Sequence, residues 1–444
     1  MDRTTGRPGA RRIWLRSAGT VCAVALGTLG TFGTLAAPAN AAPANAANGA
    51  PANAAKAAPA NAAKAAPANA ANAAIGGTSG PAARAATPWT LRTPLSETVS
   101  TEFWDVAATG AKDAWAVGRK TDGADGPAPV IKHWNGTTWT DVPAAGTGDE
   151  PGQLEKVSAA APDDVWAAGV QSGETTSPVV VRHWDGEKWA DTAHAAPPEG
   201  WMSFVGDIAA FGEKSAWLTS FDWDQNSGAS TSRLERWTGS AWQEVSLPAA
   251  PGGGEVRPWD ITGTGPDDVW ITAEAVTGDV SDPLLYHWNG RGWTVREVPT
   301  PAEHPTGWVA NHAVATGRGS VYVVGKTNDA EAPEATMANQ WTGSRWRSLP
   351  ALPVDEANAA GADGAGRLWI AGWSAGGRHS VLSRWTGTKW ATEALPADVT
   401  EHSEMSTVSG IAAVPGTNGV FAAGTAGCQS DPVMCGVVVS RDVG

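Results

Sequence analysis

Aromatic, acidic and amide residues recur at one position along the chain, eleven residues before each of seven regularly spaced aromatic residues. The residues at this position are Trp104, Glu155, Gly206, Trp259, Asn311, Asn358 and Gly410. The next position holds Asp105, Lys156, Asp207, Asp260, His312, Ala359 and Ile411. Aromatic rings stack on apolar surfaces of a ligand, while carboxylates and amides hydrogen-bond to its polar groups. These residue types predict a site for a carbohydrate or a peptide, provided that the fold gathers them.

The predicted ligand contacts comprise the aromatic, acidic, amide and imidazole side chains of these two positions, with two tryptophans from the loops that follow the second strands. They are Trp104, Asp105, Glu155, Asp207, Trp259, Asp260, Asn311, His312, Asn358, Trp223 and Trp373. The alternative is that these residues only shield the end of a central channel. Paired carboxylates drawn from Asp105, Glu155, Asp207 and Asp260 would also suit glycoside cleavage, so a glycan-cleaving hydrolase or lyase stays open.

A segment with alternating oxygen donors resembles the start of a calcium-binding loop, at Asp222, Asp224 and Asn226. Its glycine, Gly228, comes one position late, and Arg233 stands where a closing Glu would be. An ordinary solvated loop is therefore expected, with calcium binding as the alternative. The chain has neither a His-x-x-x-His zinc pattern nor a Gly-x-Ser-x-Gly nucleophile motif. We predict a non-enzymatic protein without a cofactor or catalytic residues.

The elements that must position these residues are indicated by a repeat. Trp-x-Gly-x-x-Trp begins at Trp134, Trp184, Trp237, Trp288, Trp341 and Trp385. An aromatic residue precedes each copy, at Trp115, Trp166, Trp217, Trp270, Tyr322 and Trp369. The roughly 45–53-residue period is typical of β-propeller blades. The x-Gly pair inside each copy predicts a tight hairpin, and the Trp rings are expected to fill the wedges between neighbouring blades.

Short β runs punctuated by Gly, Pro and Asp predict four strands in each unit and an all-β fold. The predicted blades cover about 104–143, 154–197, 204–248, 258–299, 308–350 and 357–396. The last unit, 408–444, supplies three strands, and the segment 89–94 resembles the missing outer strand. We predict that residues 88–94 complete this unit, which closes a seven-bladed β-propeller without a free sheet edge.

Over residues 88–444 this arrangement resembles the secreted bacterial β-propellers of the kelch and galactose-oxidase-like kind. Kelch blades carry a glycine pair at the end of the second strand. Here five blades carry a single glycine at this position, namely Gly118, Gly169, Gly325, Gly372 and Gly424. The third and fourth blades have none. Galactose-oxidase chemistry is not expected, because the two tyrosines, Tyr286 and Tyr322, occupy strand positions of the repeat. The resemblance implies a fold and not an activity.

Residues 1–41 have the pattern of an export signal, with five arginines before an apolar run and Ala-Asn-Ala at 39–41. The Arg11-Arg12 pair resembles the twin-arginine motif, so that route and the general secretory route both remain open. Residues 42–87 repeat Pro-Ala-Asn-Ala-Ala-Lys-Ala-Ala. They predict a disordered linker, because such a composition offers almost no side chains that could build a core.

The formal net charge of −14 becomes −18 when residues 1–41, with five Arg and one Asp, are removed. An acidic surface repels phosphate backbones, which argues against nucleic acid as a partner. Cys428 and Cys435 are predicted to form a disulfide, as in an exported protein. We expect a secreted or envelope-associated monomer, without a membrane span after signal cleavage, that recognises a glycan or an extracellular protein. A structural envelope scaffold is the other alternative.

Overall fold

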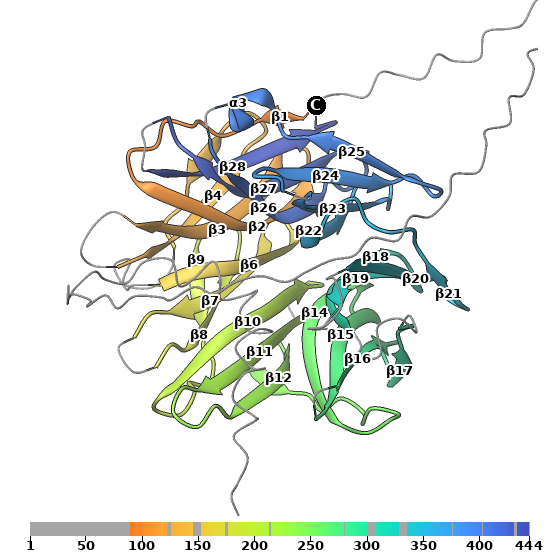
Figure 1. The fold of residues 1–444 in the computed structure, drawn as a ribbon. Helices are drawn as coiled ribbons and strands as arrows, with labels where there is room; N and C mark the ends of the chain where they lie inside the picture. The colour runs from red at the N-terminus through yellow and green to blue at the C-terminus, as the bar shows by residue number, and fades with distance from the viewer. Residues whose placement is uncertain are drawn as a thin grey trace, which may run out of the picture. The chain divides into compact units, whose positions relative to one another are not determined.

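The computed structural model describes residues 89–121, 126–144, 152–173, 176–212, 215–278, 280–300, 308–327, 335–374, 376–401, 403–429 and 433–443. All of them belong to the second of two compact units, which spans residues 86–444. The predicted export signal and linker lie outside the described residues. The strands form seven four-stranded sheets (Figure 1). This confirms the prediction of an all-β, seven-bladed propeller.

Each blade runs from an innermost strand at the central channel to an outermost strand at the rim. The first three blades are β2 (Ser100–Gly110), β3 (Asp113–Thr121), β4 (Ala128–Trp134), β5 (Trp139–Asp141); β6 (Gly152–Ala161), β7 (Asp164–Gln171), β8 (Val179–Trp184), β9 (Trp189–Thr192); and β10 (Trp201–Ala210), β11 (Ala216–Asp224), β12 (Ser230–Trp237), β13 (Trp242–Glu244). Blades four and five are β14 (Glu255–Gly265), β15 (Asp268–Thr277), β16 (Val280–Trp288), β17 (Trp293–Glu297); and β18 (Trp308–Gly317), β19 (Ser320–Thr327), β20 (Thr336–Trp341), β21 (Trp346–Ser348). Blades six and seven are β22 (Glu356–Ala362), β23 (Leu368–Trp373), β24 (Ser380–Trp385), β25 (Trp390–Ala394); and β26 (Ser406–Ala413), β27 (Val420–Gly427), β28 (Met434–Arg441), β1 (Thr90–Leu91).

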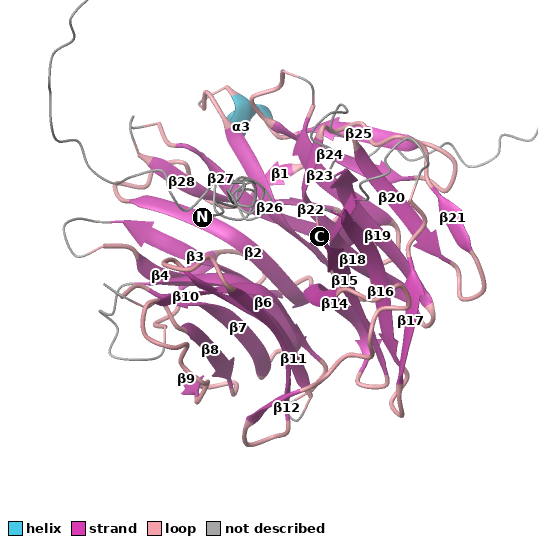
Figure 2. Cartoon of the chain, turned by 60° about the horizontal axis from the view of Figure 1, so that its bottom comes forward, coloured by secondary structure: helices cyan, strands magenta, loops and turns pink. Residues whose placement is uncertain are grey.

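The second strand of each blade is the most deeply buried, because neighbouring blades cover both of its faces. In β3 and β15 every residue of the central stretch is buried, whereas the outermost strand β5 is short and partly exposed. The predicted hairpins join the third and fourth strands. In them Gly136 has φ +97° and Gly387 has φ +94°, backbone conformations that glycine adopts without strain. Strands dominate the described residues, and α3 (Ala397–Thr400) is a single short helix among them (Figure 2).

The repeated aromatic residues form the predicted wedges between blades. The ring of Trp115 in blade one lies 5.0 Å from Trp184 and 5.5 Å from Trp189 of blade two, measured between centroids. Trp166 and Trp217 make the same contacts with the Trp pair of the next blade. The second-strand tryptophans are at most 1% exposed. Each wedge therefore buries large apolar rings, whose removal from water stabilises the ring of blades.

Blade seven closes the ring as predicted. Strand β1 pairs with β28 through Thr90↔Ser440 and Leu91↔Val439. Trp89 takes the place of the missing terminal Trp and meets Trp369 edge-on, with centroids 5.4 Å apart. The closing segment continues past the hairpin of β27 and β28, where the N–H of Gln429 donates to the carbonyl of Leu95 at 3.2 Å.

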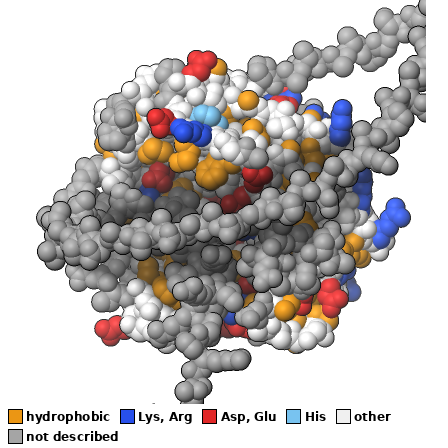
Figure 3. Space-filling view, in the orientation of Figure 1, with side chains coloured by type: hydrophobic (Ala, Val, Ile, Leu, Met, Phe, Trp, Pro, Cys, Tyr) orange, Lys and Arg blue, Asp and Glu red, His pale blue; other side chains and the backbone are white. Residues whose placement is uncertain are grey.

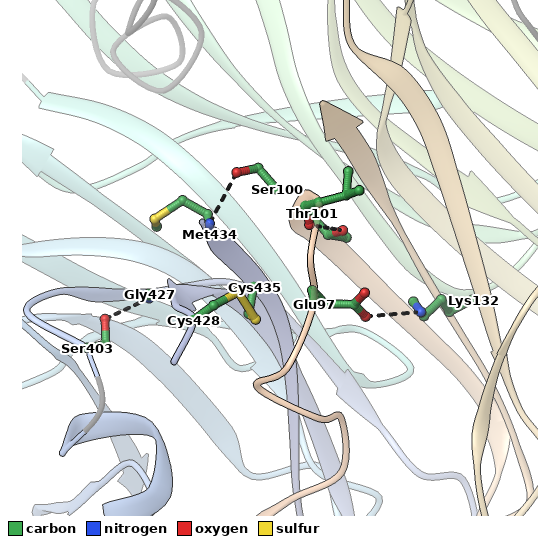
Figure 4. The surroundings of a disulfide bond; sticks show 10 residues. Glu97, Ser100, Thr101, Lys132, Ser403, Gly427, Cys428, Met434 and Cys435 are labelled. Carbon is green, nitrogen blue, oxygen red and sulfur yellow. Dashed lines mark hydrogen bonds and ion pairs between the residues drawn. A yellow bond between two sulfur atoms is a disulfide. The ribbon is translucent and has the colours of Figure 1, made fainter. Parts of the chain in front are cut away.

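The predicted disulfide joins Cys428 to Cys435 across that same hairpin (Figure 4). Both cysteines are buried in the hydrophobic cluster that also contains Trp89 and Leu95. Nearby, the hydroxyl of Ser100 accepts a hydrogen bond from the N–H of Met434 at 3.2 Å (Figure 4). The disulfide therefore braces the part of blade seven on which the ring closes. Across the described ranges, no helix combines the length and apolarity needed to cross a bilayer.

Candidate functional site

Each innermost strand contains a β-bulge, which decides where the candidate residues point. In blade one Phe103 pairs with Gly118 and Asp105 pairs with Val117, so that Trp104 is left unpaired between them. The register shifts at the same place in the other blades. We call the residues at this position the bulge ring: Trp104, Glu155, Gly206, Trp259, Asn311, Asn358 and Ser409. A bulge re-aims the side chains that follow it.

Two sequence expectations about this position are wrong. The bulge ring lies inside the innermost strands and not at their beginnings, because β2 starts at Ser100, before Trp104. In blade seven the count is off by one residue. Gly410 pairs with Ala423 and occupies the position of Asp105, which makes Ser409 the equivalent of Trp104. Blade seven is one residue longer between the bulge and the second-strand aromatic residue, Phe421, which a fixed count cannot detect.

The bulge also explains the single glycine at the end of the second strand. A Cβ atom on Gly118 would lie 1.8 Å from the carbonyl oxygen of Glu102, and one on Gly325 would lie 1.8 Å from that of Val309. No side chain fits at such a distance. Blades three and four hold Ser220 and Ala273 at this position, opposite Val205 and Pro258. The close carbonyl therefore accounts for the glycines, while blades three and four accommodate a small side chain at the same position.

The residue after the bulge faces the central channel. We call these residues the channel ring: Asp105, Lys156, Asp207, Asp260, His312, Ala359 and Gly410. All of them line a cavity of about 810 Å³. From the ring the cavity extends along the second halves of the innermost strands, past small residues such as Ala210 and Ala315. Within the described part of the chain, Ser409 alone of the bulge ring lines it. The predicted contacts are therefore divided between two places.

The carboxylates of the channel ring join neighbouring blades. An oxygen of Asp105 accepts from the N–H of Val157 at 2.9 Å. Asp207 accepts from Ile261 at 3.0 Å, and Asp260 accepts from Ala313 at 2.6 Å. His312 Nε2 lies 3.2 Å from the carbonyl of Ala357, to which it donates. The innermost strand of a blade has one unpaired edge, so these side chains satisfy backbone groups that would otherwise depend on channel water.

Asp207 and Asp260 are hydrogen-bonded to each other as well. Both oxygens of Asp260 already accept backbone N–H groups, from Ile261 at 3.1 Å and Ala313 at 2.6 Å. Asp207 is therefore the partner that holds the proton and donates it. Burial and the carboxylate of Asp260 raise the pKa of Asp207 well above its ordinary value, although Lys156 opposes the shift. Burial also raises the pKa of Asp260, against the lowering effects of Asp207 and Lys156.

The other titratable groups of the channel ring are shifted by the same enclosure. Burial raises the pKa of Asp105 to about 7. It opposes the charge of Lys156, but attraction by Asp207, Asp105 and Asp260 outweighs it, and the pKa of Lys156 is raised. Burial and the charge of Lys156 lower the pKa of His312 to about 4. At neutral pH the ring thus presents an ammonium, an uncharged imidazole and carboxyl groups that hold at least one proton.

Along each innermost strand the bulge ring comes before the channel ring, and we call the bulge ring with its nearest neighbours the mouth. Trp104 lies under the guanidinium of Arg119, which is 5.2 Å from the ring centroid and 3.0 Å from Glu102. The amide of Gln153 donates to Glu155 at 2.8 Å. Burial raises the pKa of Glu155, while this hydrogen bond lowers it. The mouth thus contains both hydrogen-bonded polar pairs and half-buried aromatic rings.

An aromatic cluster spans blades three and four at this mouth. Phe204 and Phe221 stack with centroids 4.7 Å apart and planes 12° apart, and Phe221 meets Trp259 edge-on at 5.7 Å. All three are half-buried. Sequence reasoning found Trp259 but missed both phenylalanines. The equivalent cross-strand pair in blade one is Glu102 and Arg119. The signal in the sequence was therefore that both members of this pair are aromatic in blade three and polar in blade one.

The remaining predicted contacts stand apart from the cavity. Trp223 and Trp373 lie within β11 and β23 and not in loops, because these second strands extend farther than expected. The indole N–H of Trp373 donates to the carbonyl of Ser406 in blade seven at 3.1 Å. Asn311 and Asn358 are half-buried members of the bulge ring.

The calcium candidates serve other partners. Asp222 is 1% exposed and forms an ion pair with Arg233 at 2.6 Å, and Ser203 donates to it at 2.6 Å. Asp224 accepts the N–H of Asn226 at 2.9 Å and so shapes its own turn. Nowhere in the described ranges do three or more His, Cys, Asp or Glu side chains form a group that could hold a metal ion. The guanidinium of Arg233 neutralises the negative charge that Asp222 would otherwise offer to a cation.

No protein-family model and no curated protein matches the chain. Among solved structures it is similar to the β-propeller domain of the Trilobed protease from Pyrococcus furiosus, with 10% identity, a TM-score of 0.46 and coverage of 76% of this chain and 97% of that one. It is also similar to an ulvan lyase of polysaccharide lyase family PL25, with 12% identity, a TM-score of 0.43 and coverage of 76% and 93%. The six-bladed, fucose-recognising lectin of Aleuria aurantia gives 16% identity, a TM-score of 0.37 and coverage of 67% and 96%. Likenesses this distant carry no functional argument, and the kelch-like family remains a resemblance.

Proposed function

We propose that this protein is a non-enzymatic recognition module that acts outside the cytoplasm and binds a glycan or an extracellular protein at the mouth formed by the bulge ring. The observation that carries the proposal is the half-buried cluster of Phe204, Phe221 and Trp259. The sequence pattern at residues 1–41 and the disulfide of Cys428 support an exported location.

Unlike the tryptophans of the wedges, the aromatic cluster is not needed to fill the space between neighbouring blades. Wedge residues such as Trp166 are fully buried and fill the space between blades. Phe221 and Trp259 retain exposed area, and blades one and two do without aromatic residues at the positions of Phe204 and Phe221. Half-exposed rings next to polar groups are what a sugar ring or an apolar side chain of a partner can stack upon.

Charged and polar groups lie around the cluster. Arg257 pairs with Glu255 at 2.8 Å and approaches Glu274 at 4.0 Å. Burial raises the pKa of Glu274, while Ser281 and Arg257 lower it. Figure 3 shows a face of the molecule on which hydrophobic and acidic side chains lie side by side. Such mixed chemistry fixes the orientation of a ligand that the rings hold.

The proposal is tested by binding of the full chain to an array of bacterial cell-wall and plant polysaccharides. Trp259→Ala and Phe221→Ala should each abolish the binding that the unmodified protein shows, while lowering the Tm by no more than a few degrees. Trp390→Ala is the matched control, because Trp390 is a half-buried ring at the outer rim. Retained binding by both mouth variants would refute the glycan site. Absence of binding by the unmodified protein would direct the search to protein partners.

A glycan-cleaving activity is the second candidate, favoured by one observation. Asp207 keeps a proton beside Asp260 inside a cavity, the state that a general acid requires. The backbone hydrogen bonds of these carboxylates also give them a structural role that needs no catalysis. Release of reducing ends from the arrayed polysaccharides, lost in Asp207→Asn, would support the enzyme. Equal release by Asp207→Asn and the unmodified protein would exclude Asp207 from it.

A further inference from the structure

The far end of the channel cavity contains an incomplete copy of a hydrogen-bond arrangement that other blades complete. At the start of the second strand, Asp113 in blade one and Asp268 in blade four each use Oδ1 for a histidine, at 2.6 Å and 2.8 Å. Each uses Oδ2 to accept from a threonine hydroxyl, that of Thr109 or of Thr264. These threonines lie at a second bulge near the end of the innermost strand.

Blade two keeps the aspartate and the histidine but lacks the hydroxyl. Asp164 Oδ1 lies 2.8 Å from His183 Nε2 and accepts from the indole N–H of Trp166 at 2.9 Å. Ala160 occupies the position of the threonine, at the same bulge. Among the described residues Oδ2 has no hydrogen-bond partner, although the side chain of Asp164 is only 4% exposed. A buried carboxylate oxygen without a donor is costly, so this atom requires one from outside the blade.

The position of the missing hydroxyl is accessible from the cavity. Ala160 is exposed, and Ala160, Ala161 and Asp164 all line the cavity of about 810 Å³. A cavity of this size falls within the range of ligand pockets in proteins. Its wall is built largely from alanine, glycine and small hydroxyl residues. Such a wall accepts the CH faces of a sugar without obstructing them.

Farther along the same cavity, the channel ring supplies groups suited to additional hydroxyls. Lys156 donates hydrogen bonds, and the carboxylates of Asp105 and Asp260 have lone pairs beyond those used by backbone N–H groups. A hydroxyl both donates and accepts, so a ligand with several hydroxyls matches donors and acceptors that occur together.

We propose that the channel cavity binds a neutral carbohydrate and that one sugar hydroxyl donates to Asp164 Oδ2, in the place that Thr109 and Thr264 fill in blades one and four. This site is separate from the aromatic mouth. It goes beyond the proposed function, and it would stand if the mouth bound a protein instead.

The test uses the full chain with D-glucose, D-galactose and N-acetyl-D-glucosamine, followed by ligand-observed NMR and by the shift in Tm. Ethylammonium chloride serves as a cationic probe of the same carboxylate. Ala160→Thr supplies the missing hydroxyl, and Ala160→Ser does so without the additional methyl group if threonine disturbs folding. We expect a sugar to bind the unmodified protein, and either variant to weaken that binding about tenfold. Either variant should raise the Tm of the sugar-free protein.

Two controls separate the explanations. Ala160→Val fills the same space without a hydroxyl, so it should weaken sugar binding without raising the Tm. Trp259→Ala should leave binding in the cavity intact, which distinguishes failure here from failure of the proposed mouth. Sugar binding that survives Ala160→Thr would overturn the proposal. So would binding of ethylammonium without any sugar, or no binding of any probe.

Discussion

The wedges between blades and the wall of the channel arise from the same repeat, yet they differ in how closely the blades resemble one another. In the wedges the same aromatic rings recur, as in the contacts of Trp115 and Trp166 with the following blade. The channel ring instead holds Asp, Lys, His, Ala and Gly. The space between two neighbouring blades has a similar shape at every wedge, because the blades are related by rotation. The channel wall only has to satisfy local backbone groups, so its side chains are free to serve a ligand.

Removal of a wedge ring should have the largest effect on stability. Trp166→Ala deletes a fully buried indole that stacks on His183 at 4.3 Å and contacts Trp237, and should cost about 3–5 kcal/mol of unfolding free energy. Trp259→Ala at the mouth should cost about 1 kcal/mol, because its ring is only half-buried. Urea unfolding of the full chain measures both values. Equal losses would remove the distinction between wedge and mouth.

Removal of the disulfide at the ring closure should have an intermediate effect on the free energy of unfolding. Replacement of Cys428 and Cys435 by serine should lower stability by about 2–3 kcal/mol, because the cross-link restricts a short loop in the unfolded chain. The same hairpin contacts Leu95, so the segment 89–95 should become more sensitive to proteolysis. Limited proteolysis with and without a dithiol reductant tests this link. An unchanged cleavage pattern would show that the closure does not depend on the disulfide.

The bulge predicts which second-strand positions tolerate a side chain. Gly325→Ala should cost about 1–3 kcal/mol, because the new Cβ would meet the carbonyl of Val309 at 1.8 Å and the strands must shift. Ala273 holds the equivalent position in blade four, where Ala273→Gly should change stability by less than about 1 kcal/mol. Thermal unfolding of both variants compares them. A tolerated alanine at 325 would contradict the steric account.

Substitutions in the channel ring should have the smallest effect on the free energy of unfolding, and this effect should depend on pH. The folded pKa of Asp207 is raised, so folding takes up a proton; this stabilisation is present at low pH and is lost as pH rises through the folded pKa. For Asp105 the loss falls between about pH 4 and pH 7. Asp207→Asn can accept from Ile261 and donate to Asp260 without titrating. It should stabilise the protein at pH 8, by about 1 kcal/mol, and not at pH 4.5.

Asp260→Asn is the matched comparison. Both oxygens of Asp260 accept backbone N–H groups, so the amide would place a donor against one of them and destabilise the fold at either pH. Urea midpoints at pH 4.5 and pH 8 distinguish the two variants. If both substitutions behave alike at pH 8, Asp207 is not the residue that holds the proton.

Much of the architecture could be predicted from the sequence because it depends on local and periodic signals. The spacing of the Trp motifs predicted seven blades, and the resemblance of residues 89–94 to an outer strand predicted the closure. The disulfide followed from an even pair of cysteines in a chain with an export pattern. The site was predicted less well. Trp104 and Asp105 are adjacent in the chain, yet only Asp105 lines the cavity, because the bulge turns them to different places.

By itself, the sequence determined the fold, the closure and the rings that fill the wedges, since turn chemistry and hydrophobic period act over a few residues and repeat in every blade. The tertiary structure decided which side chains face the channel, and which ones meet. Asp105 contacts Val157, Asp207 contacts Asp260, and Phe221 contacts Trp259, all between blades. Such contacts join residues tens of positions apart. Their geometry depends on bulges and on the angle between sheets, which no local pattern records.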